Sequence, residues 1–181
     1  MCRHISWKHD VWCVRVLNGT MSERFSNHQS ILDFIGRFLV VCPQCSSRAL
    51  VRRGDKGEIV LTCPTCGYAR TDSKQKSAIA FASSPAAFGD GTVGVGVPVD
   101  SYFHIPLWLQ TPCCGEVLWA YNEEHLAFLE AFVMAKQRTS VLGEHGWSNQ
   151  SLMNRLPLWM KLAKNRDEVL RCLEKLKQKL Y

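Results

Sequence analysis

The chain has 181 residues, of which 46% are hydrophobic and 21% charged, and its formal net charge is +6 at pH 7. These values match average globular usage and exclude intrinsic disorder and fibrous architectures. No stretch approaches the roughly 18 consecutive apolar residues of a membrane-spanning helix, and the first ten residues lead into no apolar signal-peptide core. We therefore expect a cytoplasmic protein with no membrane partner.

Residues 1–40 are expected to form an N-terminal extension followed by an amphipathic helix. Four early residues are of types that zinc favours, but their spacing fits no common zinc template, and a short strand is the alternative interpretation. Met21 offers an alternative start for the natural chain. From Asn27 onward apolar residues recur at helical spacing. The early residues are Cys2, His4, His9 and Cys13, and the helical set is Ile31, Phe34, Ile35, Phe38 and Leu39.

The pattern with the most specific chemistry lies in residues 41–72. Cys42, Cys45, Cys63 and Cys66 form C-x2-C-x17-C-x2-C, within the spacing expected for four-cysteine zinc sites. Each pair contains a proline that restricts the backbone to a turn, and the second pair is followed by a glycine. Zinc prefers four thiolates arranged tetrahedrally, and four thiolates leave no position for substrate. The sequence therefore predicts one structural Zn²⁺.

The segment between the two cysteine pairs predicts a β-hairpin. Residues 49–53 and 58–62 are the expected strands, and Gly54-Asp55-Lys56-Gly57 favours a tight reversal between them. This arrangement brings the two pairs to the same end of the hairpin, where they can share an ion.

Thiol redox chemistry is the main alternative for these cysteines. Paired thiols at this spacing can also cycle to a disulfide. A redox protein normally has one such pair between a strand and a helix, whereas two pairs at this separation favour metal. Nine cysteines without an export signal also argue for reduced thiols rather than a disulfide framework.

Residues 42–70 resemble zinc ribbons, through their CPQC and CPTCG turns. The resemblance implies metal binding and includes ribbons of transcription factors, RNA polymerase subunits and topoisomerases, which often contact nucleic acid or protein. The later PLWLQTPCCG, LWAYN and LPLWM runs are similar to those of bacterial zinc-ribbon proteins whose function is not assigned.

Basic residues are concentrated around this motif and in the tail. Residues 41–80 hold seven basic and three acidic residues, residues 155–181 hold eight and three, and residues 81–154 hold two and seven. Such clusters are typical of proteins with a polyanionic partner and also of solvated surfaces. Basic side chains with an aromatic ring suit single-stranded DNA or RNA. The candidate nucleic-acid-binding residues are Arg48, Arg52, Arg53, Lys56, Tyr68 and Arg70.

Residues 73–100 are rich in glycine, alanine and serine and predict a flexible linker or long loop. Residues 101–181 predict a hairpin over residues 107–121, a helix capped by Asn122, short helices near Ser148 and Pro157, and a last helix with an Asn165–Glu168 capping box. Cys113, Cys114 and Cys172 are expected to be packing residues, although the adjacent pair with His104 or His125 is an alternative metal group.

The sequence thus predicts an α+β protein that contains a small zinc ribbon, a second hairpin and C-terminal helices. The leading hypothesis is a non-catalytic zinc-binding protein that contacts DNA or RNA through a basic ribbon and a basic C-terminal helix. The alternative is a protein-interaction adaptor that uses zinc only for structure. An enzyme has the least support, because no nucleophile-base pair, paired acids or open metal site is recognisable.

Overall fold

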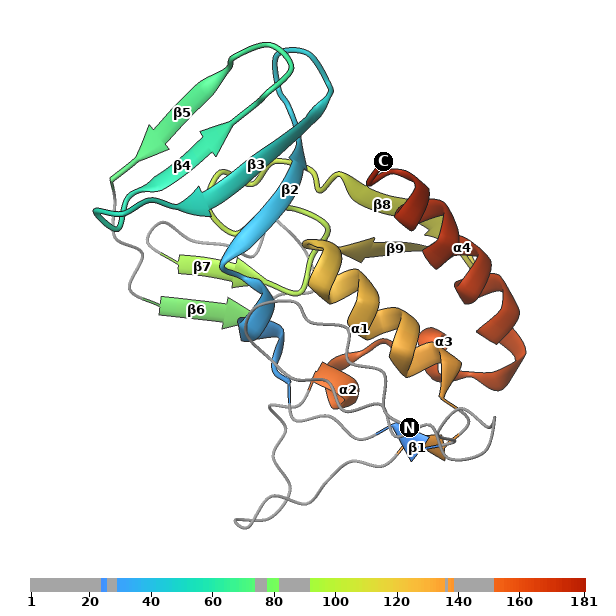
Figure 1. The fold of residues 1–181 in the computed structure, drawn as a ribbon. Coiled ribbons are helices and arrows are strands. Elements are labelled where there is room, and N and C mark those ends of the chain that lie inside the picture. The colour runs from blue at the N-terminus through green and yellow to red at the C-terminus, as the bar shows by residue number, and fades with distance from the viewer. Residues whose placement is uncertain (1–23, 26–28, 74–77, 82–91, 136, 139–151) are drawn as a thin grey trace, which may run out of the picture.

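The computed structural model describes residues 24–25, 29–73, 78–81, 92–135, 137–138 and 152–181 (Figure 1). The candidate ligands in the first 13 residues lie outside this part of the chain. The helical elements are η1 (Ile31–Phe34), α1 (Glu123–Met134), α2 (Leu152–Arg155), α3 (Leu158–Lys161), η3 (Ala163–Asn165) and α4 (Arg166–Gln178). The strands are β1 (Arg24–Phe25), β2 (Arg37–Val41), β3 (Arg48–Arg53), β4 (Ile59–Thr62), β5 (Ala69–Asp72), β6 (Ala78–Phe81), β7 (Thr92–Val95), β8 (Leu109–Cys113), β9 (Glu116–Ala120) and β10 (Gln137–Arg138).

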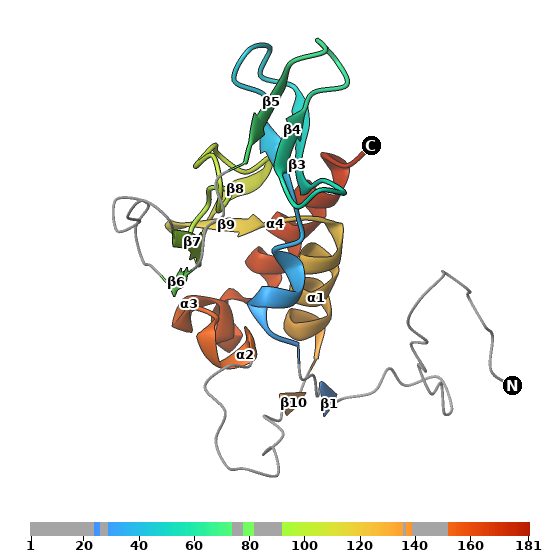
Figure 2. The same cartoon turned by 90° about the vertical axis from the view of Figure 1, so that its left-hand side faces the viewer.

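The largest sheet is antiparallel and has the order β2-β3-β4-β5. Its central hairpin confirms the predicted reversal, since the Gly54 amide donates to the Glu58 carbonyl at 2.7 Å. Gly57 has φ = 85°, a conformation that glycine adopts without a steric penalty. The loops between β2 and β3 and between β4 and β5 lie at the opposite end of the sheet and point away from the rest of the molecule (Figures 1 and 2).

The two faces of this sheet differ in burial. On one face, side chains from β2, β3 and β4 are at most 5% exposed and belong to the main hydrophobic core. The Phe38 ring meets the Tyr121 ring at a centroid distance of 4.9 Å and the Tyr102 ring at 5.9 Å. On the other face, called here the open face, Leu50 and Val60 are half-buried and Arg52 is exposed. The buried set is Phe38, Val40, Ala49, Val51, Ile59 and Leu61.

Strand β2 connects the sheet to the remainder of the protein. One edge of β2 pairs with β3. At the other edge, the Leu39 amide donates to the Tyr121 carbonyl at 2.8 Å and the Val41 amide donates to the Pro106 carbonyl at 2.9 Å. The Trp108 amide in turn donates to the Leu39 carbonyl at 2.9 Å. The four-stranded sheet and the C-terminal half therefore share backbone hydrogen bonds as well as a core.

The predicted helix around residues 27–39 is wrong for most of its length. Among the described residues of this segment, only Ile31–Phe34 is helical, as a 3₁₀ turn capped by Ser30, and Arg37–Val41 is strand. Ile31 and Phe34 are buried as expected. The three central residues of β2 are all buried, as in a strand that is covered on both faces. Such a continuous apolar run is hard to distinguish from a helical segment by the spacing of apolar residues alone.

The glycine-rich segment contains more regular structure than the expected linker. Strands β6 and β7 pair in parallel, in register from Ala78↔Thr92 to Phe81↔Val95. After β7, the Gly96 amide donates to the Tyr121 hydroxyl at 2.9 Å, and Gly96 has φ = 100°. Valines at alternating positions, among them the buried Val95 and Val97, are typical of a strand, although the intervening glycines favour a loop in the sequence.

The C-terminal half follows the predicted order of hairpin, helix and final helix. Strands β8 and β9 form an antiparallel hairpin, and α1 and α4 pack side by side (Figure 1). The Asn122 side chain caps α1 by accepting the His125 amide at 2.9 Å. Leucines and a valine of α4 face the core as expected, namely Val169, Leu173 and Leu176.

The predicted Asn165–Glu168 capping box is wrong. Asn165 has helical backbone angles at the end of η3, whereas a capping residue normally has extended ones, and its side chain makes no capping hydrogen bond. Its side-chain Nδ2 instead donates to the Trp159 carbonyl at 2.9 Å and joins α3 to the turn before α4.

The architecture confirms the α+β class, with antiparallel sheets and C-terminal helices. Within the described residues, none of the helices combines the length and the apolar character needed to cross a membrane.

Candidate metal centre

The four predicted cysteines lie on two turns with the same backbone pattern. In the first turn, between β2 and β3, the Cys42 amide donates to the Ser47 carbonyl at 2.8 Å and the Ser46 amide donates to the Cys42 carbonyl at 2.9 Å. Ser46 has φ = 59°. This turn reverses the chain and directs the side chains of Cys42 and Cys45 to one side.

The second turn, between β4 and β5, repeats each of these bonds. The Cys63 amide donates to the Tyr68 carbonyl at 2.8 Å, and the Gly67 amide donates to the Cys63 carbonyl at 3.0 Å. Gly67 has φ = 74° at the position equivalent to Ser46. The shared pattern explains why each cysteine pair presents its sulfurs in the same way.

The two turns bring all four sulfurs together. The Sγ atoms of Cys42 and Cys66 are 3.7 Å apart, and those of Cys45 and Cys63 are 3.6 Å apart. All four Sγ atoms lie within 4.8 Å of one another. Four sulfurs at about 2.3 Å from a tetrahedral ion would be separated by about 3.8 Å, so the spacing fits zinc. A disulfide would need about 2.05 Å, and all four cysteines are free thiols.

The pKa values of the thiols show why a cation suits this cluster. Hydrogen bonds from the backbone and side chain of Ser47 lower the pKa of Cys45 to about 6. The Tyr68 amide also lowers the pKa of Cys66, but desolvation and the three neighbouring cysteines outweigh it and raise that pKa to about 12. Four adjacent thiols resist full ionisation without a counter-charge. A divalent ion would supply this charge and hold all four as thiolates.

The predicted nucleic-acid-binding residues do not share one surface. Arg52 and Lys56 are exposed near the β3–β4 turn, and their side chains have no hydrogen-bond or ion-pair partner among the described residues. Arg53 is nearby, and its Nη1 donates to the Gly57 carbonyl at 3.3 Å. The alternation of side chains along β3 places Arg53 on the buried face of the sheet and Arg52 on the open face. These three residues form what we call the basic turn.

The other three residues of that set lie elsewhere. Arg48 donates from Nη1 to the Leu180 carbonyl at 2.6 Å, near the end of α4. The Arg70 guanidinium lies 4.9 Å above the centre of the Phe103 ring. Tyr68 is half-buried and packs against the core. Contacts within the protein therefore hold these three side chains.

Three further cysteines in the described residues, Cys113, Cys114 and Cys172, do not extend the metal cluster. Cys113 and Cys172 are buried, as expected for packing residues, whereas Cys114 is exposed on the turn and the packing prediction is wrong for it. Burial raises the pKa of the Cys113 thiol, and the neighbouring Cys172 adds to this effect. In the part of the chain that the structure describes, the four-cysteine cluster is the one group of histidine, cysteine and acidic side chains close enough to bind an ion.

The environment of His125 was not predicted from the sequence. This residue is 2% exposed in the core and stacks on the Phe34 ring at a centroid distance of 5.0 Å. The sequence did contain one indication of this burial. His125 lies four residues before Leu129 and seven before Phe132, which places it on the apolar face of α1.

Comparisons with protein-family models, with curated proteins and with solved structures found no match to this chain. The geometry of the four cysteines is therefore the evidence for function in this chain, and it indicates a site that could bind a metal ion.

Proposed function

We propose that this chain is a zinc-ribbon protein that holds one structural Zn²⁺ and contacts single-stranded nucleic acid through its basic turn, without catalysing a reaction. The single observation that carries the proposal is the cluster of four Sγ atoms within 4.8 Å. Cys42, Cys45, Cys63 and Cys66 would be the ligands. Four thiolates complete the tetrahedral shell, so the ion would stabilise the turns and leave no site for a reacting molecule.

The position of the charges supports contact at the basic turn rather than at the cysteines. A zinc ion with four thiolates has a net charge of −2, which would repel phosphate. The basic turn lies at the other end of β3, which has six residues, so about 17 Å of strand separates the two. This exceeds the Debye length of about 8 Å at physiological salt. The thiolate charge is therefore largely screened at Arg52, Arg53 and Lys56.

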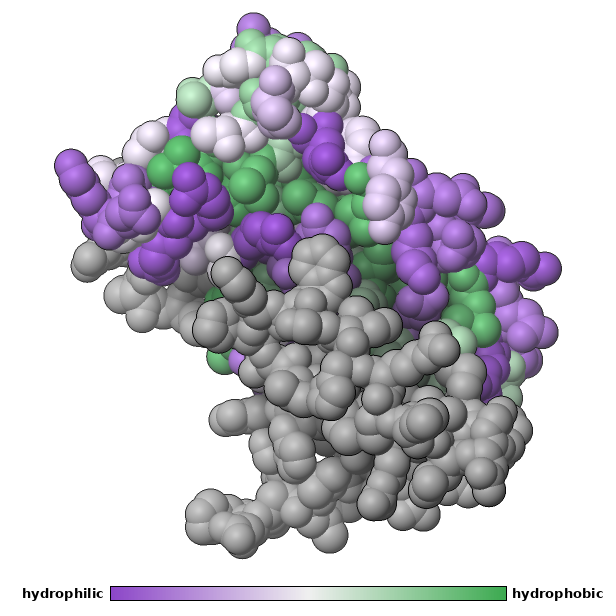
Figure 3. Space-filling view, viewed as in Figure 1, coloured by the Kyte–Doolittle hydropathy of each residue, from purple (hydrophilic) through white to green (hydrophobic). Residues whose placement is uncertain are grey.

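The open face of the sheet adds an apolar surface beside these charges. Leu50 and Val60 are half-buried there, and Figure 3 shows hydrophobic surface over the sheet with hydrophilic side chains around it. Bases of a single strand could pack on this surface while phosphates meet the cations. Arg37, the cross-strand neighbour of Arg52, is paired with Glu123 and is not counted among the cations.

The metal part of the proposal is tested by measuring the zinc content of the purified protein. We expect one zinc per chain, and loss of zinc together with a large loss of stability when Cys63 and Cys66 are both changed to serine. Cys114→Ser is the matched control, because Cys114 is exposed and lies outside the cluster. A double variant that retains zinc and stability would contradict the site.

The nucleic-acid part is tested by fluorescence anisotropy with a labelled single-stranded oligonucleotide at several salt concentrations. Changing Arg52 and Lys56 to alanine should weaken binding and reduce the slope of log K against log salt by about 0.7 for each phosphate that the variant no longer neutralises. The control changes Lys164 and Lys175, two exposed cations of the C-terminal helices, in the same way. Absence of binding at low salt, or equal losses of affinity in the two variants, would contradict the basic turn as the interface.

A protein-interaction adaptor is the second candidate, and the half-buried apolar side chains of the open face favour it. An adaptor predicts a partner whose binding is insensitive to salt and is abolished when Leu50 and Val60 are changed to threonine. Threonine keeps the strand preference of these positions while lowering their hydrophobicity.

A further inference from the structure

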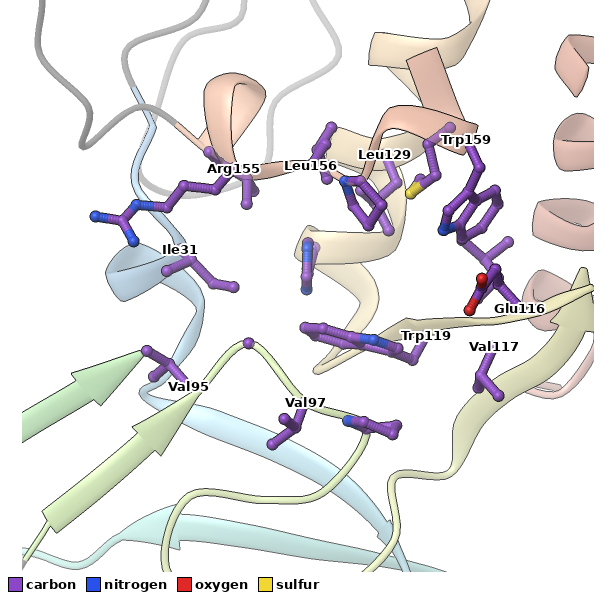
Figure 4. Close-up of a pocket in the computed structure, with 17 residues that line it drawn as sticks. Ile31, Val95, Val97, Glu116, Val117, Trp119, Leu129, Arg155, Leu156 and Trp159 are labelled. Atoms are coloured by element: carbon purple, nitrogen blue, oxygen red, sulfur yellow. The ribbon is translucent and has the colours of Figure 1, made fainter. Parts of the chain in front are cut away.

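A cavity of about 570 Å³ lies apart from the cysteine cluster, between the end of β7, strand β9, helix α1 and the short helices α2 and α3 (Figure 4). Its size falls in the range of pockets that bind small molecules. The proposed zinc and nucleic-acid functions make no use of it. Its main apolar lining residues are Val95, Val97, Trp119, Leu129, Leu156 and Trp159.

His125 lines this cavity and has an unsatisfied polar atom. It is among the lining residues and is 2% exposed. Its Nδ1 accepts the Tyr121 amide at 3.3 Å, which leaves Nε2 as the nitrogen that carries hydrogen in the neutral ring. Nε2 is buried and has no hydrogen-bond partner among the described residues. Burial lowers the pKa of His125 to about 3, so the ring is neutral at physiological pH.

An isolated donor of this kind points to a missing acceptor. Buried polar side-chain atoms are nearly always hydrogen-bonded, and an exception calls for an explanation such as a bound molecule. Among the described residues of the lining, the charged ones are Glu116 and Arg155, one of each sign, so their charges balance. This balance, together with two indole rings, favours an uncharged and mainly aromatic ligand.

We propose that the cavity binds a small, uncharged, mainly aromatic molecule with one hydrogen-bond acceptor, such as a ketone oxygen, which accepts the hydrogen of His125 Nε2. Trp119 of β9 and Trp159 of α3 line the cavity from different elements and would contact the faces or edges of the ligand (Figure 4).

The test uses 6-propionyl-2-(dimethylamino)naphthalene, a neutral fluorescent ketone whose emission depends on polarity and on hydrogen bonding to its carbonyl. We expect saturable binding with one site per chain and a shift of emission from its position in water. Leu156→Trp, which adds bulk to a lining residue that is 8% exposed, should abolish binding. Leu158→Trp makes the same change at a residue that is 72% exposed and is not part of the lining, and it should leave binding unchanged.

The hydrogen bond from His125 is tested separately from the volume of the cavity. His125→Phe should bind the ketone about five-fold more weakly, the equivalent of one neutral hydrogen bond, and should bind the corresponding propyl analogue, which lacks the carbonyl, as the natural chain does. In the natural chain, the ¹⁵N resonance of His125 Nε2 should move when the ketone is added, which does not depend on the folding of any variant. No saturable binding, equal binding by Leu156→Trp, or an unmoved Nε2 resonance would each overturn the proposal.

Discussion

Mildly acidic solution is predicted to destabilise this protein through His125. Burial lowers the pKa of this imidazole from 6.5 to about 3. The unfolded chain therefore binds a proton more readily than the folded chain at this residue. The contribution to stability is complete above pH 6.5 and is lost progressively as the pH falls from 6.5 toward 3.

The size of this loss follows from the width of the pKa shift. Each pH unit below the unfolded pKa costs about 1.4 kcal/mol. Between about pH 7.5 and about pH 5, the free energy of unfolding should therefore fall by about 2 kcal/mol on account of His125 alone. The loss reaches about 4 kcal/mol near pH 3, at which point many carboxyl groups also titrate.

Urea unfolding of the natural chain and of His125→Phe, both loaded with zinc, measures the effect at each pH. Acid also releases zinc from thiolates, but it does so in both proteins, so the difference between the two free energies isolates the imidazole. We expect this difference to change by about 2 kcal/mol between about pH 7.5 and about pH 5. A difference that stays constant with pH would refute the reasoning.

Further substitutions at Asn122, Leu173 and Arg37, with a control at Leu158, test the packing around the site. Asn122 caps α1 and donates from Nδ2 to the carbonyls of Phe34 and Arg37 at 2.9 and 2.8 Å, so Asn122→Ala should lower the free energy of unfolding by about 2–4 kcal/mol. Asn122→Asp keeps the cap and loses both donations, so urea unfolding should place it between the natural chain and Asn122→Ala. Leu173→Ala empties a fully buried position of α4 and should cost about 2–5 kcal/mol, whereas Leu158→Ala should change stability by less than about 0.5 kcal/mol; equal effects would contradict the assigned core. Arg37→Ala should lower the free energy of unfolding by less than about 1 kcal/mol, because its ion pairs with Glu123 and Glu124 are solvent-exposed. A larger loss in thermal or urea unfolding would show that these pairs stabilise the fold more than their exposure suggests.

The parts of the fold that the sequence predicted well depend on local rules. Each cysteine pair contains proline or is followed by glycine, and these residues favour a tight turn. The number of residues between the two pairs is enough for one β-hairpin. Asn122 followed by two glutamates marks the start of α1, because a side-chain acceptor and negative charge both suit a helix N-terminus. The hairpin at residues 107–121 likewise follows from two apolar runs around a turn.

The parts that the sequence did not predict depend on partners distant along the chain. Residues 37–41 form a strand because β3 pairs with one edge and residues 106–121 with the other, which no local pattern reveals. The pairing of β6 with β7 is also non-local. The cavity around His125 is assembled from six elements between residues 31 and 160, so its existence could not be derived from any single motif.

The position of β2 also bears on how this protein avoids unwanted association. An exposed strand edge offers unpaired amides and carbonyls to other chains. Because β2 is hydrogen-bonded along both edges, the outer edge of the four-stranded sheet falls to β5, which has only four residues, Ala-Arg-Thr-Asp, two of them charged. A short, charged edge strand is a poor template for a second sheet. The sheet can thus carry apolar residues on its open face while resisting edge-to-edge aggregation.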